Sequence, residues 1–227
     1  MSLSQHRITS LFLIPLLFVV VEARSQEIDP FFVIELWVEL DPIVADGTER
    51  PLPQEVAVDR MLDEAQETLS GLVYGYRFEY YPGDPARGTQ EMFELEPHAR
   101  IIRGDPRLRV LQTWAEGDSL YSRMSYTMDE AQTAWFRGWH SSAQIRTAGT
   151  GRSPVILGAA TKPQALPDGV RMAIRNYARQ VEFNRPQLIT GAAILAEPPR
   201  YTVREGHYEA EVAIYLQIDR IVPYRVY

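Results

Sequence analysis

Alternation of apolar and polar side chains marks three stretches of the chain. Residues 31–40 read FFVIELWVEL, residues 72–80 end in YRFEY, and residues 207–218 repeat the alternation near the C-terminus. Successive side chains of a β-strand point to opposite faces of the sheet. This two-residue period therefore predicts three strands, each buried on one face.

A helical period marks two longer stretches. Apolar side chains recur every three to four positions in residues 54–70, and Gly71 stands where a left-handed residue would end the helix. Residues 167–181 carry a second apolar stripe, opened by a proline and an aspartate. A shorter third helix is expected over residues 129–136.

Shorter apolar runs between turn residues fill most of the remaining chain. The pattern predicts further strands over residues 99–103, 107–114, 120–127, 154–160, 188–196 and 200–204. Strands joined by short turns pair antiparallel. We therefore predict an α+β fold, with antiparallel sheet or sheets and two or three amphipathic helices packed on one face.

The predicted organisation has four parts. Residues 1–25 form a signal peptide, residues 26–136 an N-terminal αβ unit, residues 137–153 a loop or linker rich in Gly, Ser and Thr, and residues 154–227 a C-terminal αβ unit of helix plus β-hairpin. Both units contain a Leu-Pro pair that opens a helix leading into a strand, which suggests two related units. Ordinary αβ geometry produces the same pattern without duplication.

The N-terminus has the order of a secretory signal. His6 and Arg7 precede the apolar run 8–21, and small residues stand before Gln26, the expected start of the mature chain. The run is shorter than the ~20 apolar residues that a spanning helix needs. We expect cleavage, periplasmic or secreted localisation and no stable membrane insertion afterwards, with an uncleaved anchor as the alternative.

The net charge and the absence of cysteine exclude several classes of partner and chemistry. The chain has 23 basic and 30 acidic residues, and removal of residues 1–25 leaves 21 − 29 = −8. This acidic balance argues against nucleic acid as a partner. The chain contains no cysteine, which excludes disulfides, thiol chemistry and a lipid attached to cysteine.

No cofactor or metal signature is present. The histidines after the signal segment lie far apart, and neither a serine-hydrolase elbow nor a dinucleotide fingerprint occurs. The segment 149–153, GTGRS, comes nearest to a phosphate-binding loop. It lacks the lysine and the following helix, so a flexible loop is the simpler interpretation.

The best candidate binding site lies where the third helix meets the polar loop. Trp135, Arg137, Trp139 and His140 bring indole, guanidinium and imidazole groups together, and Arg152 follows in the loop. This interpretation predicts exposed indoles. The alternative is that the two tryptophans pack the loop onto the core.

Arginines 171, 175 and 179 also recur every four residues, on the helix face opposite the apolar stripe. Solvation or pairing with carboxylates explains such a row more simply than an anion site.

Two functions fit these observations. The first is a non-catalytic cell-envelope or periplasmic protein that binds an envelope protein or a glycan. The second is an exported hydrolase of cell-wall glycan or peptide that uses carboxylates and His140 as acid and base.

Overall fold

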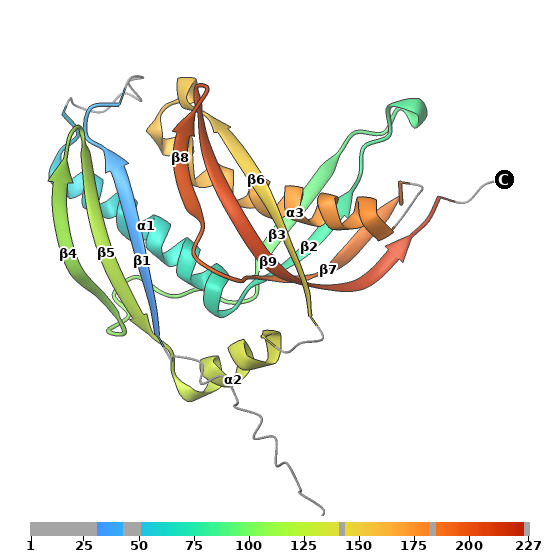
Figure 1. The fold of residues 1–227 in the computed structure, drawn as a ribbon, viewed down its shortest axis with the longest axis horizontal. Coiled ribbons are helices and arrows are strands. Elements are labelled where there is room, and N and C mark those ends of the chain that lie inside the picture. Colours follow the sequence, from blue (N-terminus) through green and yellow to red (C-terminus); the bar gives the residue numbers. More distant parts are fainter. Residues whose placement is uncertain (1–30, 43–50, 141–143, 182–184, 225–227) are drawn as a thin grey trace, which may run out of the picture.

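Two antiparallel sheets, each with a long helix on one face, make up the described part of the chain (Figure 1). The computed structural model describes residues 31–42, 51–140, 144–181 and 185–224. The expected signal segment lies outside these residues. The strands are β1 (Phe31–Glu39), β2 (Tyr76–Tyr81), β3 (Met92–Pro97), β4 (Leu108–Glu116), β5 (Ser119–Thr127), β6 (Ile145–Pro154), β7 (Leu188–Leu195), β8 (Arg200–Arg204) and β9 (His207–Val222), and the α-helices are α1 (Gln54–Val73), α2 (Glu130–Trp139) and α3 (Ala165–Val181). The α+β prediction is confirmed.

The larger sheet, sheet B, contains a long hairpin. Its strand order is β3-β2-β7-β9-β6, and β8 also pairs with β9, so that β7 and β8 together run along one side of β9. Strand β6 pairs antiparallel with the other side. Strands β6 and β7 are therefore parallel to each other, and α3 joins them across β9 as a split βαβ unit.

The smaller sheet, sheet A, confirms the first predicted strand. Its order is β1-β5-β4, and Ile34, Leu36 and Val38 of β1 are buried beneath α1. Met61 and Leu69 from the apolar stripe of α1 are 1% and 0% exposed. The two-residue period of the strand and the helical period of α1 thus meet in one core.

Helix α1 does not end at Gly71, as the sequence predicts, but at Val73. A Cβ atom on Gly71 would collide with the hydroxyl of Tyr76, so glycine lets this tyrosine pack against the helix. The left-handed residue that follows the helix is Gly75, with φ +72°. The predicted strand 72–80 is accordingly shorter, and begins at Tyr76.

The prediction of a loop over residues 137–153 is wrong. Helix α2 continues to Trp139, and β6 occupies Ile145–Pro154 as an edge strand of sheet B. A Cβ atom at Gly149 or Gly151 would collide with backbone atoms of α3. Glycine on this face lets the helix lie directly on the strand, so the strand needs no apolar side chains there.

Two of the predicted strands do not form in the described residues. Residues 99–103 form part of the connection between β3 and β4, and the predicted strand 154–160 is mostly two 3₁₀ turns, Val155–Leu157 and η3 (Ala159–Gln164). Of its aliphatic residues, Val155 is buried, whereas Ile156 and Leu157 are 72% and 64% exposed. A short apolar run does not distinguish a strand from such turns.

The same pairing scheme occurs in both parts of the chain. Strand β1 leads into α1 and pairs with β5, the second strand of the β4–β5 hairpin. Likewise β6 leads into α3 and pairs with β9, the second strand of the β8–β9 hairpin. Strands β2 and β3 of the N-terminal part join sheet B through β7, so the two parts share one sheet.

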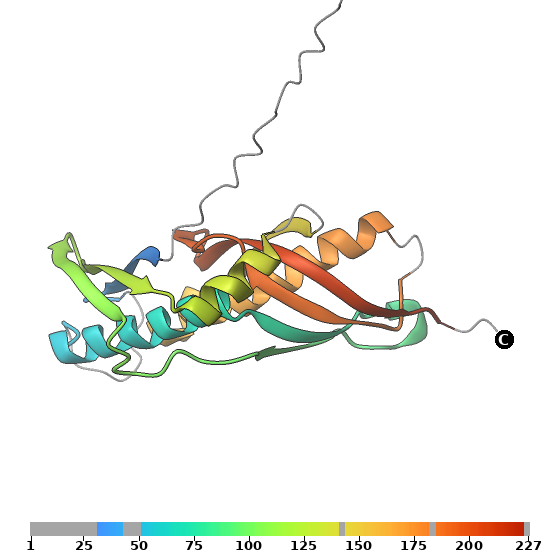
Figure 2. The same cartoon turned by 90° about the horizontal axis from the view of Figure 1, so that it is seen from below.

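Helix α2 lies at the junction of the two sheets. Seen from below, it is in front of the strands (Figure 2). Phe136 contacts Phe32 of β1 edge to face at 5.2 Å between ring centroids, and His140 contacts Tyr215 of β9 at 4.6 Å. Helix α2 thus packs against sheet A and sheet B at once.

A candidate binding groove beside helix α2

Helix α2 begins with a capping box. The side chain of Asp129 accepts a hydrogen bond from the backbone N–H of Gln132 at 2.8 Å, and the Gln132 side chain accepts one from the N–H of Asp129 at 3.0 Å. These two bonds satisfy backbone donors that the first helical turn leaves free. They explain why the helix begins where the sequence predicts.

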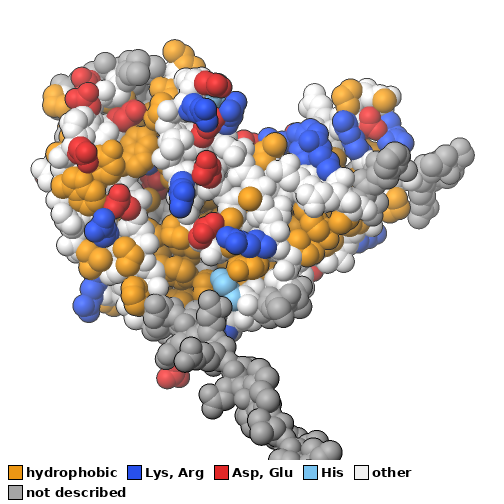
Figure 3. All heavy atoms as spheres, viewed as in Figure 1, with side chains coloured by type: hydrophobic (Ala, Val, Ile, Leu, Met, Phe, Trp, Pro, Cys, Tyr) orange, Lys and Arg blue, Asp and Glu red, His pale blue; other side chains and the backbone are white. Residues whose placement is uncertain are grey.

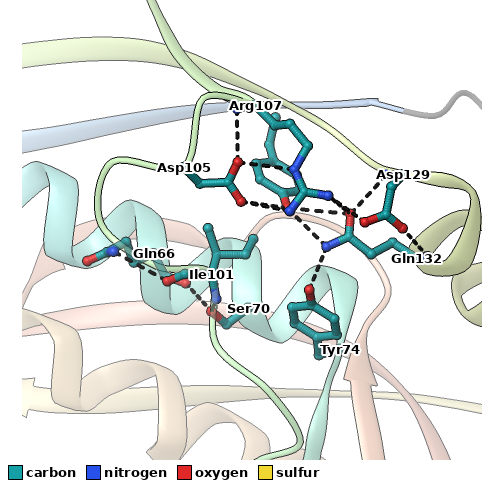
Figure 4. Close-up of polar contacts among 9 residues, drawn as sticks. Gln66, Ser70, Tyr74, Ile101, Asp105, Arg107, Asp129 and Gln132 are labelled. Atoms are coloured by element: carbon teal, nitrogen blue, oxygen red, sulfur yellow. Dashed lines mark hydrogen bonds and ion pairs between the residues drawn. The ribbon is translucent and has the colours of Figure 1, made fainter.

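Arg107 joins this cap to the connection between β3 and β4 (Figure 4). Its guanidinium donates to both carboxylate oxygens of Asp105, at 3.1 and 2.8 Å, and to Oδ2 of Asp129 at 2.6 Å. These bonds lower the pKa of Asp105 below its usual range. The backbone N–H of Gln132 and the Arg107 guanidinium lower the pKa of Asp129.

The same polar network reaches α1. Gln132 Nε2 donates to the hydroxyl of Tyr74 at 2.6 Å, directly after the end of α1. Closer to β3, the hydroxyl of Ser70 in α1 accepts the N–H of Ile101 at 2.9 Å (Figure 4). Helix α2 and the connection 98–107 are therefore both held on the C-terminal end of α1 by polar contacts.

The two predicted indoles occupy different environments. Trp135 is 45% exposed, and its Nε1 donates to the backbone oxygen of Tyr74 at 3.2 Å. Trp139 is 6% exposed and belongs to the core. The expectation that both indoles are exposed is therefore wrong for Trp139. The rings contact each other edge to face at 6.3 Å.

His140 and Arg137 flank this pair without sharing its pocket. The Nδ1 atom of His140 lies 2.8 Å from the backbone oxygen of Phe136. Burial lowers the pKa of His140, and the nearby Arg146 acts in the same direction. Arg137 is exposed on the surface of α2.

Arg152 lies apart from the other predicted site residues. It is near the far end of β6, seven residues from Ile145 and about 23 Å along the strand at ~3.3 Å per residue. Its guanidinium pairs with Glu209 of β9 at 2.6 Å. The structure thus brings Trp135 and Trp139 together, places Arg137 and His140 outside their pocket, and leaves Arg152 at the far end of β6.

The groove beside α2 crosses the face of sheet B that α3 does not cover. It has a volume of about 650 Å³, and both indoles line one end. Four exposed carboxylates and one guanidinium line its floor: Glu79, Glu94, Glu96, Asp219 and Arg77. The formal charge of these five groups is −3. We call this site the α2 groove.

His98 lines the same end of the α2 groove as Trp135. Its ring contacts Trp135 edge to face at 5.8 Å. Burial lowers the pKa of His98, and Arg77 adds to the effect. Its Nε2 is buried from solvent and has no hydrogen-bond partner among the described residues.

These charged residues could not be recognised as a group from the sequence. Arg77 and Glu79 occupy the polar positions of a predicted strand, but β3, which carries Glu94 and Glu96, was not expected. Asp219 comes from the far end of the chain. Only strand pairing brings the four carboxylates onto one face.

A second cluster of titratable groups lies in the interior. Lys162, the only lysine of the chain, is 4% exposed. Its Nζ donates to Glu64 Oε2 at 3.0 Å and to the backbone oxygen of Trp37 at 2.6 Å. Burial lowers the pKa of Lys162 and raises that of Glu64. Because the cluster is closed to solvent and ties η3 to α1 and β1, we regard it as structural.

Neither region resembles a metal centre. Within residues 31–42, 51–140, 144–181 and 185–224, no group of three His, Asp or Glu side chains is arranged to hold a metal ion. A separate question is whether any helix spans a membrane. Within the described residues, no helix is both long enough and apolar enough to do so.

Comparison with known proteins finds one relative and one family model that match this chain. The chain is 24% identical over 195 residues to an uncharacterized protein of Treponema pallidum (strain Nichols), covering 86% of this chain and 82% of that protein. No solved structure matches it. A protein-family model matches residues 20–224. The chain therefore belongs to the family that this model describes.

Proposed function

We propose that the protein is exported and acts as a non-catalytic binding protein of the cell envelope, with the α2 groove as the binding site for a basic segment of another envelope protein. The export part of this proposal rests on the N-terminal sequence. The binding part rests on the charge and shape of the groove.

The arrangement of Glu79 and Glu94 is the observation that carries the proposal. They are directly opposite each other on β2 and β3, where like charges repel at a Cβ separation of about 5 Å. The neighbouring pair of Arg77 and Glu96 is attractive. A lysine or arginine of a partner, placed between Glu79 and Glu94, would remove the repulsion.

The aromatic end of the groove complements this charge. The half-exposed ring of Trp135 offers a face to a cation or to an apolar side chain. The ring of His98 packs against it edge to face. A basic peptide with an apolar or aromatic neighbour would use both the carboxylates and the aromatic end, whereas a neutral glycan would leave the carboxylates unmatched.

The alternative function, hydrolysis of cell-wall glycan or peptide, would use the same carboxylates, Glu79 and Glu94, as acid and base. A general acid for glycoside hydrolysis needs a carboxyl group whose pKa is raised by withdrawal from water. Glu79 and Glu94 are both exposed, and His140 lies outside the groove. These features favour binding. Release of soluble fragments from purified cell walls by the protein, lost in Glu79→Gln, would favour hydrolysis instead.

A labelled nine-residue peptide of alternating lysine and leucine, with one tryptophan, tests the binding site by fluorescence anisotropy. We expect binding that weakens with salt, because exposed charges are screened beyond about 10 Å at 0.1 M. The double variant Glu79→Gln, Glu94→Gln should weaken it about tenfold, or ~1.4 kcal/mol. The matched control Glu116→Gln removes an exposed carboxylate from the β4–β5 hairpin of sheet A. Equal affinities for the double variant, the control and the wild type would exclude the groove.

Export is tested separately. Mass spectrometry of the protein from fractionated cells should find a mature chain that begins at Gln26 outside the cytoplasm. Intact N-termini in the cytoplasmic fraction would overturn this part of the proposal and leave the peptide-binding result unaffected.

A further inference from the structure

A second pocket lies on the other side of sheet B, between α3 and the β2–β3 hairpin. It has a volume of about 500 Å³, within the range of small-molecule sites. Arg175 and Arg179 of α3 and Arg185 of the following connection line it, together with three prolines. Arginine side chains gather over α3 and this hairpin in the surface view (Figure 3). We call this site the arginine pocket.

The carboxylate on the wall of the pocket is paired with arginines of α3. Glu91 accepts hydrogen bonds from the hydroxyl of Tyr80 and from Arg171, both at 2.6 Å. Tyr80 is 2% exposed, so this contact is fixed by the core. Arg175 lies further off, with 3.8 Å between its Nη1 and Glu91 Oε1. Because Arg171 also donates to Asp168 at 2.6 Å, Arg171 and Arg175 pair with Glu91 together.

The guanidinium groups that line the pocket converge from two segments. Arg175 and Arg179 are one helical turn apart and share a face of α3. Arg185 is fixed from the other side, because its Nη1 donates to the backbone oxygen of Gly83 at 2.8 Å. Among the described residues that line the pocket, Glu91 is the only carboxylate. The pocket therefore has an excess of positive charge in a chain that is acidic overall.

We propose that the arginine pocket binds a phosphate monoester. The planar guanidinium group donates two parallel hydrogen bonds to phosphate, and three such groups match the charge of about −1.5 to −2 that a phosphate monoester carries at pH 7. Pro82, Pro85 and Pro186 add apolar walls. The organic part of the ligand packs against these prolines, since the cavity is larger than a phosphate ion needs.

Isothermal titration calorimetry of the purified protein with phenyl phosphate tests the site. We expect saturable binding with a Kd below 1 mM, at least tenfold weaker binding of benzoate, and weaker binding of inorganic phosphate, which lacks the ring. Affinity for inorganic phosphate equal to that for phenyl phosphate would overturn the role of the apolar walls. Absence of heat up to 10 mM phenyl phosphate would overturn the site itself.

The double variant Arg175→Gln, Arg179→Gln identifies the binding residues. It should reduce the affinity for phenyl phosphate at least tenfold, while the matched control Arg146→Gln, on the other face of sheet B and paired with Glu197, leaves it unchanged. Circular dichroism checks that both variants fold. Unchanged affinity in a folded double variant would place the ligand elsewhere and refute the assignment.

The source of the phosphate is distinguished with vesicles. Sedimentation with vesicles that contain phosphatidic acid, reversed by phenyl phosphate and absent in the double variant, would identify a lipid headgroup as the ligand. Binding of phenyl phosphate without sedimentation would identify a soluble phosphate ester. Sedimentation that persists in the double variant would contradict recognition of the headgroup by this pocket.

Discussion

Helices α3 and α2 differ in how much of their attachment to the protein is backbone packing and how much is polar contact. Helix α3 lies on the glycines of β6 with its backbone in direct contact, and Lys162, three residues before it, forms a buried ion pair with Glu64. Helix α2 buries two large side chains, Phe136 and Trp139, and is otherwise held by polar contacts centred on Arg107. Close backbone packing that excludes water holds a helix rigidly. Polar contacts exposed to water each contribute less to the free energy of folding. We therefore expect α3 to be the scaffold and α2 the weaker, adjustable wall of the groove.

The largest effect is expected at the buried pair. The substitution Lys162→Met should lower the free energy of unfolding by about 3–5 kcal/mol, because Glu64 is left buried without its partner. Urea denaturation measures the loss. Arg103→Gln, which breaks an exposed pair with Asp59, should cost less than about 1 kcal/mol. Equal losses in the two variants would show that burial does not distinguish these pairs.

The close contact of α3 with β6 should be the next most sensitive feature. Gly151→Ala places a methyl group against backbone atoms of α3, and we expect a loss of about 1–3 kcal/mol from overpacking. Gly138→Ala in α2 is the matched control, since its methyl group meets no neighbour within 4 Å. It should raise helix propensity and stabilise by about 0.5 kcal/mol. A neutral Gly151→Ala variant would contradict the requirement for glycine.

Loss of Arg107 should loosen the N-terminal end of α2 at a smaller cost. Arg107→Gln leaves Asp105, which is 7% exposed on its side chain, without its charged partner. Hydrogen bonds to charged groups contribute about 1.5–3 kcal/mol, and the partial exposure of Arg107 reduces the expected loss to about 1–2 kcal/mol. NMR titration should find the pKa of Asp105 raised toward 3.8, and peptide binding in the α2 groove should weaken. An unchanged Asp105 pKa would disprove the role given to Arg107.

The smallest effect is the pH dependence of α2 through His140. Its pKa in the fold is below the ordinary value of 6.5, so the unfolded chain binds more protons between these two values. Stability should be constant above about pH 7 and decrease as the pH falls through 6.5 toward the folded pKa. Thermal unfolding across this range measures it. His140→Gln should reduce the decrease to the part that His98 contributes, since burial also lowers the pKa of His98.

The sequence predicted the elements whose burial depends on their own period. Strand β1, helices α1 and α3, and strand β9 carry apolar side chains on one face because that face meets the core. Strand β6 was not predicted, because it has glycine in place of apolar side chains where α3 packs on it. The candidate cluster was predicted in part: Trp135 and Trp139 line one groove, but the charged floor was not foreseen.

By itself the sequence determined the fold class, the absence of thiol chemistry and the acidic balance, because these follow from composition and local period. The tertiary structure alone decided which charges share a surface. Strand pairing places Glu79 opposite Glu94, and helix packing places Arg175 beside Arg185. Electrostatic interaction depends on distance in space, and positions far apart in the sequence acquire that distance only on folding.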